Sequence, residues 1–160
     1  MRAFLIPISA CLILLQSSCA RTQTKPGAIT PPPDETRAIL GIVGELQEAV
    51  NLGDAARALS LHWLEDARFS EIEDWIPEPF GAEMARQTLE SVFAHFRPGD
   101  YYVEFTDIRV YLLAPTVAYA TAIQDLEFEE PAKSRVTFVF LKQDDAWGII
   151  HAHYSSMARP

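Results

Sequence analysis

The stretch from Ser134 to Ser155, SRVTFVFLKQDDAWGIIHAHYS, decides how the chain is built. Its first half is rich in β-branched and aromatic residues, which fit the pleated surface of a β-strand. The polar triplet 143–145 supplies turn chemistry, and a second run of strand-forming residues begins at Trp147. The stretch therefore predicts an antiparallel hairpin.

The second strand of this hairpin carries the most unusual residues of the chain. Side chains alternate between the two faces of a strand, so one face is predicted to hold Trp147, Ile149, His151, His153 and Ser155. The residues between them would occupy the opposite face. Two imidazoles in this arrangement lie close enough to act on one ligand or one water molecule.

The pattern Trp-x-Ile-x-His-x-His-x-Ser over residues 147–155 resembles the closing strand of SnoaL-like domains, which belong to the nuclear transport factor 2-like (ketosteroid isomerase-like) superfamily. Other segments resemble the same family: Gly53-Asp54 after a helix, Gly81 before an acidic amphipathic helix, and the strand 117–120. The likeness runs from about Thr36 to Ser155. It implies a cone-shaped α+β fold, with three N-terminal helices packed on a strongly curved antiparallel sheet around a pocket.

Hydrophobic periodicity predicts the individual elements. Apolar residues at helical spacing predict helices that begin at Asp34 or Thr36 and end near Val50, and that span 54–64 and 81–96. Strands are predicted over 67–70, 101–113 and 117–128, ahead of the hairpin. Helices followed mainly by antiparallel strands define an α+β architecture.

The segment 71–80 carries four acidic residues and two prolines. Its residues are typical of a solvated acidic loop with aromatic anchors. The resemblance gives an alternative, because the corresponding region of family members forms part of the cavity rim.

Composition excludes some classes of partner. The chain has 160 residues, enough for one domain with a real core, and a formal net charge of −9. Phosphate binding needs a basic stripe, and no run of Lys and Arg occurs, so nucleic acid is not an expected partner. We expect a small-molecule ligand, and a homodimer as in family members.

The N-terminus predicts export. A positive start and an apolar run to Leu15 are typical of a signal peptide over residues 1–18, too short to span a membrane. Small residues then precede Cys19, as in a bacterial lipobox, although Gln16 stands where leucine is usual. We expect Cys19 to be lipidated, with a Pro-rich tether over 19–33 and the SnoaL-like domain over 34–160. An ordinary cleaved signal peptide is the alternative.

This leader indicates a periplasmic lipoprotein of the bacterial cell envelope, anchored in the outer membrane since Ala20 rather than Asp follows Cys19. The lipid would be its only membrane contact. Both cysteines, Cys11 and Cys19, lie at the leader, so the domain has no thiolate metal ligand and no cysteine nucleophile. We expect no metal and no cofactor: two imidazoles and a carboxylate could bind a metal, but no third ligand is identifiable.

Candidate site residues follow from the predicted pocket. The ligand-binding candidates are Trp147, His151, His153, Tyr119 and Asp107. The candidates for a catalytic acid or base are His153, His151 and Asp66, because imidazole and carboxyl groups transfer protons near neutral pH. Both histidines could instead be structural or lie at a subunit interface.

Three functions remain open on the sequence. The domain could bind a small apolar or amphipathic molecule, or a protein partner, in its pocket. It could be an isomerase, dehydratase or cyclase that uses a pocket His or Asp in acid–base chemistry. It could also serve only for dimerisation and assembly through its sheet.

Overall fold

The computed structural model describes residues 31–127 and 131–157. The predicted signal peptide and Cys19 lie outside these residues. Helices α1 (Pro33–Asn51), α2 (Ala55–Ser60) and α3 (Ala82–His95) come first, with the short strand β1 (Ser70–Ile72) between α2 and α3. The strands β2 (Tyr102–Ala114), β3 (Val117–Glu127), β4 (Ala132–Gln143) and β5 (Ala146–Ser156) follow. The order is the predicted one; α2 is shorter than expected and β1 starts later.

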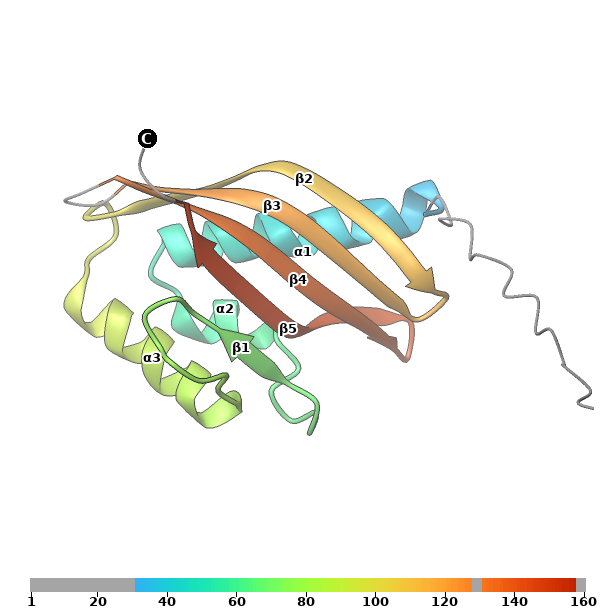
Figure 1. Ribbon diagram of the computed structural model, residues 1–160, viewed down its shortest axis with the longest axis horizontal. Coiled ribbons are helices and arrows are strands. Elements are labelled where there is room, and N and C mark those ends of the chain that lie inside the picture. The colour runs from blue at the N-terminus through green and yellow to red at the C-terminus, as the bar shows by residue number, and fades with distance from the viewer. Residues whose placement is uncertain (1–30, 128–130, 158–160) are drawn as a thin grey trace, which may run out of the picture.

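The strands form one sheet in the order β1-β5-β4-β3-β2, which bends over the helices (Figure 1). Strands β2 to β5 are antiparallel neighbours, whereas β1 pairs with β5 in parallel. The chain just before β1 continues this edge, because the Trp63 amide donates to the Ile149 carbonyl at 2.8 Å and the Ile149 amide to Leu61 at 3.0 Å. The fold is thus the expected α+β cone, with a mixed sheet.

The hairpin of β4 and β5 forms as predicted. Its turn places Asp144 and Asp145 at positive φ angles of 48° and 65°. These left-handed conformations are typical of tight hairpin turns, and aspartate tolerates them better than most residues.

Register irregularities in β2 and β5 bend the sheet and shift the faces of its strands. In β2 the register shifts between Thr106 and Arg109, and Asp107 there has a φ of 50°. In β5, His151 pairs with Val139 while Ile149 pairs with Phe140, which leaves Ile150 as an extra residue. An extra residue kinks a strand and moves every later side chain to the other face.

The core lies between the concave face of the sheet and α1. This helix buries Ile39, Val43, Leu46 and Ala49 against it. The buried residues of β3 are small, and those of β4 are large. They are Ala118, Ala120 and Ala122 in β3, and Val136, Phe138 and Phe140 in β4. The alanines of β3 pack in the core that α1 shares.

Helix α1 also covers the edge strand β2. Asn51 exchanges two hydrogen bonds with the Val103 backbone, accepting from its amide at 2.7 Å and donating to its carbonyl at 2.8 Å. The Gln47 side chain accepts from the Phe105 amide at 2.7 Å. These amide side chains bond backbone groups that a neighbouring strand would otherwise pair with. Within the described residues, no helix is long and apolar enough to cross a membrane.

Candidate functional site

A cavity of about 420 Å³ opens between α3, the end of α1 and the concave face of the sheet; we call it the cone pocket. Its wall is mostly aliphatic and aromatic, as is usual for small-molecule sites. The apolar residues of the wall are Leu46, Val50, Leu59, Leu64, Trp75, Ala85, Leu89, Val92, Phe93, Phe96, Val103, Phe105, Leu126 and Ala132.

Strand β1 places a pair of carboxyl groups in this apolar wall. Glu71 pairs in register with Ala152, a residue of the core face, so its side chain lies on the pocket side of the sheet. The backbone of Glu71 is held by Phe80, since each of the two amides donates to the other's carbonyl, at 2.8 and 2.9 Å. Glu73 follows one residue beyond β1 and also lines the pocket.

The pocket changes the ionisation of both groups. Burial, followed by the charge of Glu73 and a hydrogen bond to it, raises the pKa of Glu71 to about 8. Burial raises the pKa of Glu73 to about 7, together with the charge of Asp74 and against hydrogen bonds from Trp75 and Glu71. Burial favours the neutral form of an acid, and two nearby carboxyl groups cannot both ionise cheaply. Around pH 7.5 the pair therefore holds about one proton.

Other polar side chains line the same pocket. Burial, with the nearby charges of Glu71 and Glu73, raises the pKa of Tyr154 well above its ordinary value. Tyr101 donates its hydroxyl to the Val50 carbonyl at 2.6 Å, and burial raises its pKa to about 12. Both phenols stay protonated near neutral pH and can act only as hydrogen-bonding groups there.

His62 stands at the wall as a neutral imidazole, since burial lowers its pKa. Its Nδ1 lies 2.9 Å from the Ala58 carbonyl, which can only accept. The Nδ1 atom must therefore carry the proton, which leaves Nε2 with a free lone pair.

The predicted face of β5 is wrong beyond Ile149. Because Ile150 is an extra residue, Ala152 and Tyr154 join the core face, where they pair with Phe138 and Val136. The residues between them turn to the outer face of the sheet, away from the cone pocket.

His151 and His153 therefore do not line the cone pocket. The His151 ring bonds the Ser70 hydroxyl at 2.8 Å across the parallel pairing, and burial, followed by the charge of His153, lowers its pKa. Hydrogen bonds from Ser156 lower the pKa of Asp74, and the nearby charge of His153 lowers it further. The two imidazoles are neighbours, as predicted, but their contacts are structural ones on the outer face.

The other ligand-binding candidates also lie outside the cone pocket. Trp147 donates its indole N–H to Glu35 at 2.6 Å, near the start of α1. Tyr119 stacks on Tyr111 with ring centroids 4.7 Å apart. Its neighbours in β3 are buried alanines of the core face, so Tyr119 lies on the outer face. Asp107 is exposed at the bulge of β2.

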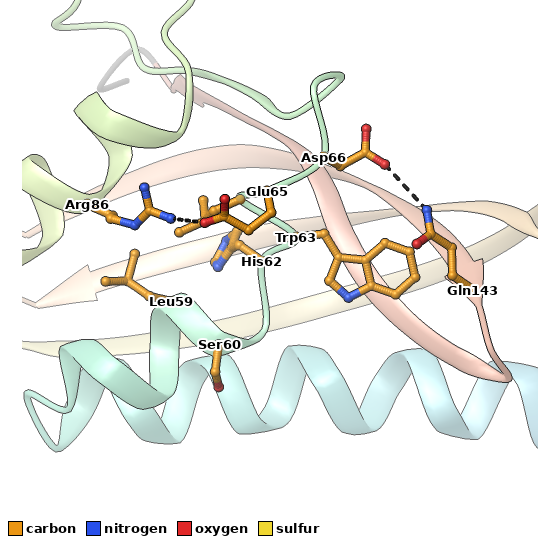
Figure 2. A pocket seen from close by; sticks show the side chains of 9 residues that line it. Leu59, Ser60, His62, Trp63, Glu65, Asp66, Arg86 and Gln143 are labelled. Carbon is orange, nitrogen blue, oxygen red and sulfur yellow. Dashed lines mark hydrogen bonds and ion pairs between the residues drawn. The ribbon is translucent and has the colours of Figure 1, made fainter.

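Asp66 lines a second, wider hollow of about 630 Å³, which we call the outer groove (Figure 2). Arg68 binds Asp66 through its side chain at 2.6 Å and holds the pKa of that carboxyl well below its usual range. Across the groove, Arg86 pairs with Glu65 at 2.5 Å. These charges are already paired, so Asp66 is a weak base and the outer groove a less suited ligand site than the cone pocket.

Sequence reasoning thus missed the carboxyl pair. Glu71 and Glu73 were interpreted as part of a solvated acidic loop, although the alternative placed this segment at the cavity rim. The signal was the alternation Glu71-Ile72-Glu73, which puts two acids on one face of a strand. Among the described residues, no group of three or more metal-ligating side chains is present.

Comparison with known proteins agrees with this architecture. The family model of the SnoaL-like domain matches residues 39–160, and the chain belongs to this family. A search of curated proteins gave no match.

Solved structures share the fold of the nuclear transport factor 2-like (NTF2-like) superfamily. An NTF2-like protein of unknown function from Pseudomonas putida aligns with a TM-score of 0.71 and 16% identity, over 83% of this chain and 92% of that one. An NTF2-like protein from Streptomyces avermitilis, described as a candidate dehydratase, aligns with a TM-score of 0.67 and 19% identity over 81% and 100%. The association domain of CaMKII from Caenorhabditis elegans aligns with a TM-score of 0.64 and 16% identity over 76% and 95%. At these identities the likeness establishes the fold alone.

Proposed function

We propose that this SnoaL-like domain binds a small apolar or amphipathic molecule in its cone pocket. The observation that carries the proposal is the cavity of about 420 Å³ with an apolar wall and the Glu71–Glu73 pair set into it. Apolar wall atoms supply affinity through surface removed from water, and a few polar groups fix the orientation of a ligand.

An uncharged apolar fluorophore, N-phenyl-1-naphthylamine, tests the proposal. We expect its fluorescence to rise on binding the wild type and to be lost in Thr88→Phe, which fills the cavity from α3. Gln87→Phe is the matched control, because Gln87 is the exposed neighbour on the same helix and lies outside the wall. Equal fluorescence in both variants would count against binding in the cone pocket.

Acid–base catalysis is a second candidate, favoured by the two carboxyl groups whose pKa values of about 8 and about 7 lie near neutral. A general acid or base works best when its pKa is close to the working pH. The likeness to the candidate dehydratase is compatible with this function. Glu73, ionised more readily than Glu71, would be the base, and protonated Glu71 the acid.

The isomerisation of 3-cyclohexenone to its conjugated isomer tests this candidate, because it needs only proton abstraction beside a carbonyl and reprotonation. We expect the wild type to catalyse it at pH 7.5 and Glu73→Gln to lose the activity while still binding the fluorophore. Turnover that survives in Glu73→Gln would exclude this base.

For location, we propose a lipoprotein of the bacterial cell envelope, acylated at Cys19 and tethered through residues 20–33. The support is the apolar leader and the small residues before Cys19. In a host with two membranes, we expect the wild type in the outer-membrane fraction and Cys19→Ser in the soluble periplasm. The same distribution for both forms would exclude acylation as the anchor.

We also propose that the domain is a homodimer through the outer face of its sheet. The support is a set of half-buried side chains on that face over which residues 31–127 and 131–157 form no further layer: Tyr111, Tyr119, Val139, His151 and His153. Similarity in fold to an association domain agrees with an assembling role.

A further inference from the structure

Within the part of the chain that the structure describes, the carboxyl pair of the cone pocket has no cation of its own. No Lys or Arg of these residues lines the wall, and none of their ion pairs includes Glu71 or Glu73. Several other acids of the domain are paired with a cation, as Asp66 is with Arg68 and Glu48 with Arg57. A buried carboxylate without a counter-ion is costly, so these two groups require a different explanation.

Two other polar groups, from other elements, face the same space with free hydrogen-bonding capacity. The hydroxyl of half-buried Tyr154 forms no hydrogen bond within the described residues. Among the described residues, every side-chain N or O atom that is shut off from solvent has a hydrogen-bond partner. Because the Tyr154 hydroxyl has none, it must open on the cavity. His62 lines both the cone pocket and the outer groove, and its Nε2 atom has a free lone pair because its Nδ1–H is bound to the Ala58 carbonyl.

These groups define what the bound molecule must offer. Glu73 accepts hydrogen bonds, Glu71 does so once ionised, the hydroxyl of Tyr154 can accept, and neutral His62 accepts at Nε2. The polar corner thus has a surplus of acceptors and negative charge, and a ligand fits it by bringing several N–H donors and a positive charge. A carboxylate ligand would bring a like charge and find no cation.

We propose that the ligand of the cone pocket is an apolar molecule with a protonated amine, whose nitrogen binds between Glu71 and Glu73 while its hydrocarbon body lies against Leu89, Phe93 and Phe96. This inference rests on the proposed function, that the cone pocket binds a small apolar or amphipathic molecule. Charge-assisted hydrogen bonds in such a site are about twice as strong as neutral ones.

The amine takes the place of the proton that the carboxyl pair otherwise shares. When the ammonium group binds, both carboxylates are stabilised in the ionised form, and the proton held by Glu71 leaves to the buffer. Binding at pH 7.5 should therefore release up to about one proton. A neutral ligand that bonds to protonated Glu71 would release none.

Calorimetric titration with three probes of one shape tests the proposal: 1-aminoadamantane, 1-adamantanol and adamantane-1-carboxylate. We expect the amine to bind at least about tenfold more tightly than the alcohol, with the carboxylate weakest, since hydrogen bonds to charged groups are stronger than those between neutral groups. The heat of amine binding should differ between phosphate and Tris buffers by the amount that proton release predicts.

Glu73→Gln should weaken the amine about tenfold and change alcohol binding less than about twofold. Glu78→Gln, at an exposed position outside the wall, should leave both unchanged. Alcohol binding as tight as the amine's, or amine binding unaffected by Glu73→Gln, would overturn the amine inference and leave the pocket function intact. If none of the three probes nor the naphthylamine dye binds, the proposed function fails as well.

Discussion

At the scale of single residues, Glu71 makes the stability of the domain depend on pH. Its pKa rises from 4.5 to about 8 on folding, so the folded state binds more protons than the unfolded chain between these values. Stability therefore falls as pH rises through this window, by up to about 1.4 kcal/mol per pH unit for each such group. Glu73, raised to about 7, adds to the slope.

We expect Glu71→Gln to remove part of this loss. At pH 8 the variant should be more stable than the wild type by on the order of 1–3 kcal/mol, whereas near pH 5 the two should be similar. Urea unfolding across this pH range measures the difference in unfolding free energy between Glu71→Gln and the wild type. Neutral His62 has the opposite effect on the pH dependence, but it is present in both proteins and so cancels in the difference. Glu78→Gln, at an exposed position, is the control. If unfolding free energy depended on pH in the same way for Glu71→Gln and the wild type, Glu71 would not be protonated in the folded state.

Gly148 lies at a position where the structure leaves no room for a side chain. The Trp63 ring lies directly against it, so an added Cβ would overlap the indole. We expect Gly148→Ala to cost about 1–3 kcal/mol of unfolding free energy, because the ring and the edge of β5 must shift. Gly41→Ala is the matched control: nothing lies near its Cβ position in α1, so alanine there should stabilise the helix by about 0.5–1 kcal/mol. Thermal unfolding of both variants measures the contrast.

At the scale of elements, α1 and β2 are joined by Asn51. Asn51→Ala leaves an amide and a carbonyl of Val103 without their partners in a half-buried place. We expect a loss of about 1–3 kcal/mol of unfolding free energy and faster hydrogen exchange at the Val103 amide. Gln87→Ala, which removes only an exposed hydrogen bond to Glu83, should change neither. Unchanged exchange at Val103 in Asn51→Ala would contradict the edge-covering role of α1.

Most elements were predictable because local signals decide them. The helical spacing of Ile39, Val43 and Leu46 and the turn at Asp144 are written in consecutive residues, and the structure confirms both. Strand β1 was harder, since it has only three residues and its parallel pairing is with a distant strand.

The site could not be placed because its faces depend on bulges. Nothing in the local sequence marks Ile150 as an extra residue; the pairing of β5 with β4 decides it. One such residue sends His151 outward and brings Tyr154 to the pocket. Glu71 likewise became a pocket residue only through the register of β1 with β5.

At the scale of the whole molecule, the outer face of the sheet is the surface that we propose as the dimer interface. Tyr119 lies in a middle strand and stacks on Tyr111, so a charge there would disturb a partner without touching the core. We expect the Cys19→Ser chain to sediment as a dimer and Tyr119→Asp in that background to dissociate at least about tenfold more readily, since a buried unpaired charge is expensive.

Leu52→Asp gives the matched control for this test. Leu52 is 55% exposed at the end of α1, and the same charge there should leave the dimer intact. Binding of the naphthylamine dye should persist in Tyr119→Asp, because the cone pocket lies on the opposite face of the sheet and is built within one chain. A wild type that sediments as a monomer at micromolar concentration would rule out the dimer, while loss of dye binding together with dissociation would mean that assembly shapes the pocket.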